Sequence, residues 1–362
     1  MNTLSANWGK NIELSIFGES HGKAIGINIG NLPAGIKLDS EKIKREMSRR
    51  APGKDRMSTA RKETDEPVIL SGVLDGVTTG APLCAIIQNS DRHSKDYSIL
   101  KTHMRPGHSD YPAFVKYGGF NDVRGGGHFS GRLTAPLVFA GAVAKQILAQ
   151  KGIRVISHIK SVHGVCDESF GPQISNETVN ALLGMRYPVL NGDILPLMQA
   201  EVEKARENLD SVGGKIECAV LGIDAGCGEP FFRSCESVLS SILFSVPAVK
   251  GVEFGDGFDL ADMCGSEAND CYYFDGDAVK AHTNHNGGIL GGITNGMPLT
   301  FTVAIKPTPS ISKEQNTVDI EKKENTTLEI KGRHDPCIVF RALPVIEAAA
   351  ALAILDIVRA DI

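Results

Sequence analysis

Residues 345–359 read VIEAAAALAILDIVR, and a helix over Val345–Val358 would be apolar on nearly every face. Such a helix has to be covered on all sides, either in a core or at a subunit interface. A second helix is predicted over Pro136–Gln150, with proline in its first turn and Gly152 just past its end. The rest of the chain, or a second subunit, therefore has to enclose the final helix.

The remaining pattern mixes helices and strands without a regular alternation. Further helices are predicted over Asp39–Arg50 (N-cap Asp39 or Ser40), Leu195–Leu209 and Arg233–Phe244. Strands are predicted over Ile12–Phe17, Ile25–Ile29, Val68–Leu74, Pro82–Gln88, Lys215–Gly222 and Leu299–Ile305. This order favours an α+β fold. No linker rich in Pro and Ser divides the chain, so we expect one domain over residues 1–362. The polar stretch Lys313–Thr327 is expected to be an exposed loop.

Composition excludes several classes of protein. The 362 residues carry 38 basic and 43 acidic side chains, a net charge of −5, so no overall field attracts nucleic acid or an anionic membrane. No apolar run reaches 18 residues, and the first residues lack a signal-peptide pattern. The eight cysteines include no C-x-x-C pair, which argues against structural zinc. We expect reduced, mostly buried thiols in a cytoplasmic protein without a metal site.

Two histidines lie in glycine-bounded turns that suit proton transfer. His21 lies in the turn Gly18–Gly22, and His108 lies in the turn Arg105–Asp110, which Pro106 and Gly107 stiffen. Ser20-His21-Gly22-Lys23 also fits the S-x-x-K pattern of acyl-serine enzymes, but no K-T-G or S-D-N partner occurs. Either histidine could instead be an ordinary turn residue.

Anions are expected to bind at local concentrations of N–H groups and positive charge. The loop Arg124–Arg132 has three consecutive glycines and runs into the helix over Pro136–Gln150, which is typical of a phosphate cradle. Segment 41–62 has nine basic and three acidic residues, with Arg50 and Arg56 flanking a Pro-Gly turn. An alternative interpretation is a nucleic-acid-binding protein that uses segment 41–62. The small number of aromatic residues and the negative net charge of the chain argue against it.

Glycines and charges late in the chain supply further candidate ligand-binding segments. Gly287–Gly292 could present its backbone to a flat ligand, while His282 and His285 have no third metal ligand nearby. Lys306–Ser310 and Gly332–Cys337 combine cations that suit an anion with Asp335, a carboxylate that stays ionised beside a basic residue.

Nine blocks of the chain, in this order, resemble the chorismate synthase family. They are Gly18–Gly22, Arg50–Gly53, Ser71–Gly80, Arg105–His108, Arg124–Gly127, Ala248–Glu253, Gly255–Phe258, Gly287–Gly292 and Arg333–Cys337. The resemblance covers nearly the whole chain. It implies a single-domain sheet–helix–sheet sandwich, usually a homotetramer. It also implies a lyase that converts 5-enolpyruvylshikimate 3-phosphate to chorismate and phosphate by trans-1,4 elimination, the last step of the shikimate pathway.

The same resemblance implies a cofactor and roles for named residues. The reaction needs reduced FMN despite no net redox change; NADP and FAD are the other redox cofactors associated with such flavoproteins. His21 and His108 would be the catalytic histidines, one serving the flavin and the other the leaving phosphate, and Asp335 would help the flavin act as base. The substrate would be bound by Arg50, Arg56, Arg105, Arg132 and Arg333. FMN would be bound by His128, Phe129, Ser130, Ala248, Gly291, Lys306, Pro307, Thr308, Pro309, Ser310 and Arg333.

This chain departs from the family pattern at two places. Many members read Gly-Gly-Arg-Ser-Ser-Ala-Arg where this chain reads GGHFSGR over residues 126–132, so His128 and Phe129 replace an arginine and a serine. An asparagine that precedes Ala248 in the family is Pro247 here. The side-chain contacts to FMN that the family pattern implies therefore change at these positions. An FMN- and NADPH-dependent oxidoreductase is the alternative function. A chain that cannot reduce its own flavin would need a separate flavin reductase as partner.

Overall fold

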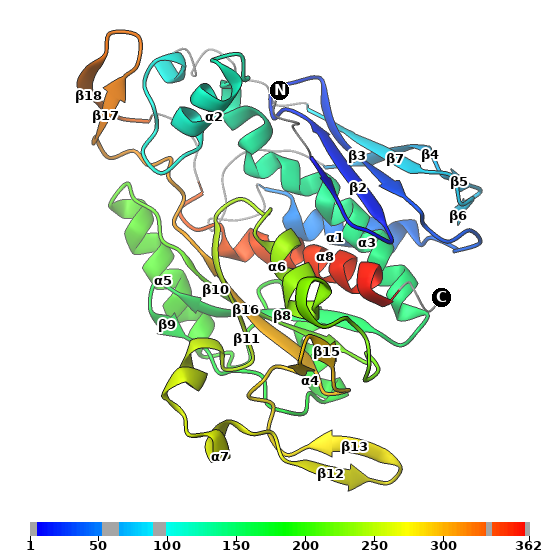
Figure 1. Cartoon of the computed structure of the whole chain (residues 1–362). Helices are drawn as coiled ribbons and strands as arrows, with labels where there is room; N and C mark the ends of the chain where they lie inside the picture. The colour runs from blue at the N-terminus through cyan, green and yellow to red at the C-terminus, as the bar shows by residue number, and fades with distance from the viewer. Residues whose placement is uncertain (1–5, 53–64, 90–98, 331–334, 359–362) are drawn as a thin grey trace.

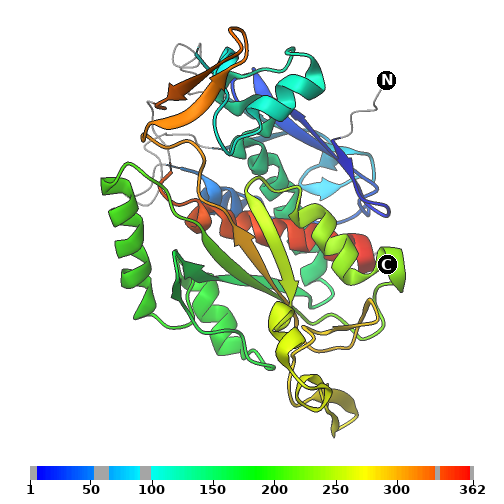
Figure 2. The same ribbon diagram turned by 60° about the vertical axis from the view of Figure 1, so that its left-hand side comes forward.

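The final helix is buried between two sheets. The structure is a computed structural model that describes residues 6–52, 65–89, 99–330 and 335–358. In it α8 (Val339–Val358) lies beside α3 (Thr134–Ala149), α1 (Ser40–Arg50) and α6 (Cys235–Leu243). A five-stranded sheet covers each side of this helical layer (Figures 1 and 2). The predicted α+β sheet–helix–sheet sandwich is thus confirmed.

Both sheets are antiparallel in the strand pairs that form them. The first has the order β1 (Asn7–Trp8), β2 (Glu13–Gly18), β3 (Ala24–Gly30), β7 (Leu83–Gln88) and β4 (Pro67–Ser71). The second has the order β11 (Val249–Phe254), β16 (Leu299–Ile305), β10 (Gly214–Leu221), β8 (Arg154–Val162) and β9 (Val165–Cys166). Sequence patterns alone predicted neither β8 nor β11.

Smaller elements surround the sandwich. The helices are α2 (Asp110–Tyr117), α4 (Asn176–Gly184), α5 (Ile194–Glu207) and α7 (Gly265–Ala268), with short 3-10 turns at Arg124–Phe129, Gly131–Leu133, Phe231–Arg233 and Gly257–Asp262. The hairpins are β5 (Val73–Leu74) with β6 (Val77–Thr78), β12 (Tyr272–Asp275) with β13 (Ala278–Ala281), β14 (Ile289–Leu290) with β15 (Ile293–Thr294), and β17 (Gln315–Asp319) with β18 (Glu324–Leu328).

Small residues allow the two central helices to pack closely. A Cβ added at Gly141 of α3 would lie 2.2 Å from the Cβ of Ala348 in α8. The alanine-rich run in α8 therefore forms the surface on which α3 packs. The structure starts α8 at Val339, six residues before the prediction, and Pro344 lies inside the helix. The predicted N-cap Asp39 is confirmed, since its side chain accepts from the backbone N–H of Glu41 and Lys42.

The single glutamate in the apolar run of α8 is neutralised inside the helical layer. Arg49 donates to both carboxylate oxygens of Glu347 at 2.6 and 2.7 Å, and Lys145 Nζ lies 2.5 Å away. The Ser157 hydroxyl of β8 donates to it at 2.7 Å. Burial alone would raise the pKa of Glu347, but the two cations hold it well below its ordinary value. The network links α1, α3, α8 and the second sheet.

Two predictions about surface features were wrong. The stretch Lys313–Thr327 is not a loop, because most of it forms the β17–β18 hairpin. Its side chains are polar, but the hairpin is held by backbone hydrogen bonds, which do not depend on side-chain polarity. Leu328 and Ile330 pack with Leu100 beneath it. The eight cysteines are free thiols, but only three are buried, because Cys166, Cys264 and Cys271 are exposed and two others are half-buried.

Candidate functional site

The turn between β2 and β3 holds His21 against the glycine-rich loop 124–129. His21 is buried, and the Ser20 hydroxyl lies 3.0 Å from its Nδ1. Ser20 also donates from its backbone N–H to Gly127 O at 3.1 Å, and its hydroxyl contacts the carbonyls of Arg124 and Gly125 at 3.1 Å. The histidine is therefore fixed to this loop by its neighbour.

Two glycines of that loop separate the two predicted catalytic histidines. A Cβ added at Gly125 would lie 2.2 Å from the His21 ring, and one added at Gly126 would lie 3.1 Å from His108 Nε2. Both glycines have positive φ, 59° and 84°. The sequence placed these histidines 87 residues apart without predicting their distance; the structure brings each of them against one of two adjacent glycines of one turn.

His108 is one member of a tight polar cluster in the turn before α2. Its Nδ1 lies 2.6 Å from Asp110 Oδ1, while Arg105 donates from Nε to Oδ2 at 2.6 Å and from Nη2 to Oδ1 at 2.7 Å. Burial would raise the pKa of Asp110, but the hydrogen bonds and charges of Arg105 and His108 hold it far below its ordinary value. The carboxylate is therefore ionised throughout the physiological pH range.

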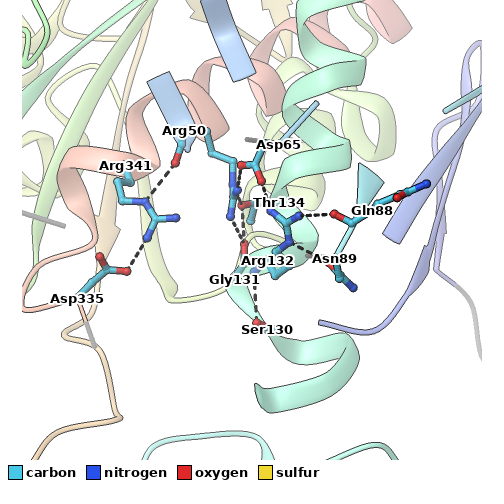
Figure 3. Close-up of polar contacts among 10 residues, drawn as sticks. All are labelled: Arg50, Asp65, Gln88, Asn89, Ser130, Gly131, Arg132, Thr134, Asp335 and Arg341. Carbon is cyan, nitrogen blue, oxygen red and sulfur yellow. Dashed lines mark hydrogen bonds and ion pairs between the residues drawn. The ribbon is translucent and has the colours of Figure 1, made fainter. Parts of the chain in front are cut away.

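Asp65 connects two of the predicted substrate arginines (Figure 3). One of its oxygens pairs with Arg50, at the end of α1, and the other with Arg132, just before α3. Arg50 donates from Nε to Thr134 Oγ1 at 3.1 Å, at the start of α3. Each of the three charged residues has at most 6% of its surface exposed. Burial would raise the pKa of Asp65, but the positive charges of the two arginines lower it.

Further hydrogen bonds join this cationic cluster to its surroundings. Asn89 accepts from Arg132 Nε at 3.1 Å and donates to the carbonyls of Glu19 and Gly22 at 3.0 Å, on either side of His21. At the other end, Arg341 donates from Nε to the carbonyl of Arg50 at 3.1 Å (Figure 3). Arg341 also pairs with the predicted catalytic Asp335 at 2.6 Å. A chain of polar contacts thus runs from Asp335 to the His21 turn.

The segment Lys306–Ser310 lies against the His108 turn. Lys306 Nζ donates to Gly107 O, and Arg105 Nη1 contacts Ser310 Oγ at 3.3 Å. Lys306 also donates its backbone N–H to Ala248 O at 3.0 Å, so Ala248 belongs to the same place. Pro309 contacts this turn as well, since its Cβ lies 3.3 Å from a Cβ added at Gly107. Lys306, which directly follows β16, therefore places its ammonium group next to the turn that contains His108.

The electrostatics and hydrogen bonding of this segment favour an anion. Burial lowers the pKa of Lys306, and the positive charge of Lys250 lowers it further. The buried hydroxyl of Thr308 has no hydrogen-bond partner among the residues that the structure describes. An anion with several acceptor oxygens would neutralise the two lysines and accept a hydrogen bond from Thr308.

The three residues that follow the glycines have separate environments. His128 is exposed, and its Nδ1 lies 2.8 Å from Gly18 O. Phe129 packs its ring 6.1 Å from Tyr117 of α2. Ser130 accepts the backbone N–H of Arg132 at 3.3 Å. They line the stretch of loop between the histidines and α3.

One further predicted residue, Gly291, does not join this site within one chain. Gly288 lies against Pro298 and Leu299 at the start of β16, whereas Lys306 follows its end. Seven residues of strand span roughly 20 Å, so Gly291, three residues after Gly288, lies far from Lys306. Arg56 and Arg333 lie outside the described residues.

Most of the glycines in the predicted backbone wall Gly287–Gly292 pack against other backbone segments of the same chain. Added Cβ atoms at Gly287, Gly288 and Gly292 would meet the chain's own backbone within 2.7 Å, and only Gly291 faces open space. His282 stacks on Tyr273 with ring centroids 4.4 Å apart. His285 instead pairs with Asp256 at 2.5 Å. No described histidine, cysteine or acidic residues form a group of three that could hold a metal ion.

Three side chains of the site were missed in the sequence, namely Asp65, Asn89 and Asp110. Asp110 had a local signal, because an aspartate two residues after a histidine in a stiff turn can reach its ring. Asp65 and Asn89 had no such signal. Asp65 pairs with Arg50 and Arg132, which lie 15 and 67 residues away, and Asn89 accepts from Arg132, which lies 43 residues away.

Comparisons with known proteins agree on one family. A family model described as chorismate synthase matches residues 12–358. A chorismate synthase of Thermococcus gammatolerans is 49% identical over 349 residues, 96% of each chain, and one of Dehalococcoides mccartyi is 42% identical over 359 residues, 98% of this chain and 96% of the relative. A solved structure titled "Crystal Structure of Chorismate Synthase" superposes with a TM-score of 0.73 at 27% identity, covering 97% of this chain and 92% of that one. Within the described ranges, no helix combines the length and hydropathy needed to cross a membrane.

Proposed function

The chain belongs to the chorismate synthase family, and from this premise we propose that it converts 5-enolpyruvylshikimate 3-phosphate to chorismate and phosphate by a trans-1,4 elimination that requires reduced FMN. Family membership makes it an enzyme of aromatic amino-acid biosynthesis, a lyase that catalyses the last step of the shikimate pathway. The chemistry of the site, the cofactor and the assembly are the parts that we propose.

One observation carries the proposal: His21 lies against Gly125 and His108 lies against the next residue, Gly126. His21 adjoins the arginine cluster through Asn89, and His108 adjoins Lys306 through Gly107. Two titratable groups that face one loop from different electrostatic surroundings suit two separate proton-handling roles.

The residues around Lys306 fit the phosphate end of FMN. Two lysines near each other and a buried Thr308 hydroxyl without a described partner supply charge and a hydrogen-bond donor. We therefore assign FMN binding to His128, Phe129, Ser130, Ala248, Gly291, Lys306–Ser310 and Arg333. When bound, reduced FMN would supply electron density as phosphate leaves and a base for the C6 proton of the substrate.

The arginine cluster suits a substrate with two carboxylates and a phosphate. Arg50, Arg132 and Asp65 together leave one net positive charge in a buried place. A guanidinium has five N–H donors, so it can bind an anion while it stays paired with Asp65. We assign substrate binding to Arg50, Arg56, Arg105, Arg132 and Arg333.

Proton transfers are assigned by what each histidine adjoins. His21, beside the arginine cluster, protonates the leaving phosphate. His108, beside the Lys306 segment, holds the ionisation state of the flavin. Asp335, which Arg341 orients at 2.6 Å, assists removal of the substrate proton.

We propose that the working form is a homotetramer of one-domain subunits in the cytoplasm. Gly291 is exposed and far from Lys306 in one chain, so its role in FMN binding requires a neighbouring subunit. Eight free cysteines suit a reducing compartment. A separate flavin reductase would keep FMN reduced in the cell.

An anaerobic turnover experiment tests the function. Purified protein is mixed with 5-enolpyruvylshikimate 3-phosphate and either dithionite-reduced or oxidised FMN, and chorismate is followed by its ultraviolet absorbance. Product with reduced FMN alone supports the proposal. NADPH oxidation by protein and FMN without any product would instead support the oxidoreductase alternative.

Lys306→Ala tests the FMN site by a binding readout. We expect FMN to bind about tenfold more weakly, because a partly buried cation to the phosphate is lost. Lys313→Ala is the matched control, since Lys313 pairs with Asp210 at 2.7 Å outside the site. Equal affinity in the two variants would remove Lys306 from the FMN site.

A further inference from the structure

Asp110 is held so rigidly that it fixes the orientation of the His108 ring. Its Oδ2 accepts two donors of Arg105, the backbone N–H at 3.1 Å and Nε at 2.6 Å. Its Oδ1 accepts Arg105 Nη2 at 2.7 Å and faces His108 Nδ1 at 2.6 Å. Asp110 is buried and begins α2, whose N-terminal N–H groups favour a negative charge. The carboxylate cannot turn without breaking bonds to Arg105.

This geometry decides where the proton of a neutral His108 lies. An imidazole nitrogen 2.6 Å from a carboxylate oxygen has to carry a proton, because two lone pairs at that distance repel. Arg105 Nη2 also lies 3.0 Å from the same nitrogen, but the contact with Asp110 is shorter, at 2.6 Å, and its acceptor carries a negative charge. The proton therefore lies on Nδ1, and Nε2 faces the Gly126 side of the ring.

We propose that Asp110 is the positioning residue of His108, keeping its Nδ1 protonated so that Nε2 is the nitrogen presented at the glycine turn. The main role of Arg105 is then to hold the Asp110 carboxylate in place, which refines the assignment of Arg105 as a substrate-binding arginine. The effect on turnover rests on the proposed function, whereas the tautomer of His108 is a property of the free protein.

Asp110→Asn makes a sharp prediction because the amide is asymmetric. Arg105 presents two donors at the Oδ2 position and one at Oδ1, so the amide oxygen takes the Oδ2 position and the NH₂ group faces His108. A donor at that place requires an unprotonated Nδ1, which moves the proton of neutral His108 to Nε2. A carboxylate-to-amide change that selects the wrong tautomer disables a histidine without distorting the fold.

The test is ¹⁵N NMR of histidine-labelled free protein at a pH where the imidazoles are neutral, with His108 assigned from its loss in His108→Gln. We expect protonated Nδ1 in the wild type and protonated Nε2 in Asp110→Asn. The control is Glu201→Gln, since Glu201 faces His163 Nδ1 at 2.7 Å on the surface; it should leave His108 unchanged. In the turnover assay Asp110→Asn should lower kcat by about 10²-fold with KM changed less than about threefold.

Each outcome bears on one claim. Protonated Nε2 in the wild type, or an unchanged His108 tautomer in folded Asp110→Asn, overturns the assignment of Asp110. If Asp110→Asn does not fold, the wild-type spectrum alone decides. A switched tautomer supports the assignment even if the wild type makes no chorismate, a result that would contradict the proposed function instead. A switched tautomer with unchanged kcat would show that turnover does not use His108 Nε2, against the proposal.

Discussion

Gly125→Ala should lower turnover by displacing His21, an effect separate from its loss of stability. The new Cβ would lie 2.2 Å from the His21 ring and 2.7 Å from the Ser20 hydroxyl, whereas ordinary contacts begin at 3.4 Å. The ring would have to retreat by about 1 Å, a misplacement that can lower a rate about 10²-fold. The positive φ of 59° adds a strain of about 1–2 kcal/mol that any alanine would meet there.

Gly152→Ala separates these two effects. Gly152 has a similar positive φ of 76°, but a Cβ there would have no neighbour within 4 Å. Urea unfolding should give both variants a similar loss of stability from strain, with any excess in Gly125→Ala due to the clash. The anaerobic assay should show a kcat about 10²-fold lower only for Gly125→Ala. Equal kcat values in the two variants would refute the claim that Gly125 sets the position of His21.

Two further changes test the buried charges of the site and the packing of the helical layer. Asp65→Asn should destabilise the protein by about 3–5 kcal/mol in urea unfolding, because Arg50 and Arg132 lose a buried counter-charge. The pKa of Asp65 in the folded protein lies below its ordinary value of 3.8, so ionised Asp65 stabilises the fold above that pH and the stabilisation is lost as the pH falls. The free energy of unfolding, measured between pH 7 and 3, should therefore depend less on pH in Asp65→Asn than in the wild type. An equal pH dependence in the two proteins would contradict this. Gly141→Ala should cost about 1–3 kcal/mol, since its Cβ would meet Ala348 at 2.2 Å, and an unchanged melting temperature would count against the close packing of α3 on α8.

Local patterns were sufficient to predict the elements whose signals are short in range. The burial of α8 follows from its apolar composition, and the start of α1 follows from the N-cap at Asp39. The histidine turns could be predicted because glycine and proline restrict or free the backbone within a few residues. The same local signals correctly gave the α+β class.

Features that depend on distant partners could not be predicted in this way. The β17–β18 hairpin looks like a polar loop until its backbone ladder and the packing of Leu328 on Leu100 are known. The role of Asp65 depends on two arginines that are distant in the sequence. Strand β8 was not predicted either, because it carries the buried His158, and the pairing of His158 with Asp167 and Glu217 cannot be deduced from an alternation of apolar residues. Tertiary packing, which no local pattern contains, decides all three.

We expect His21 and His108 to act together on the bound substrate and FMN beside the glycine turn. Anaerobic turnover of His21→Ala and His108→Ala with reduced FMN, beside equilibrium binding of FMN and substrate, tests it most directly. Each variant should still bind both ligands but turn over about 10²–10⁴-fold more slowly. Wild-type turnover in either variant would contradict the account and remove that histidine from the mechanism.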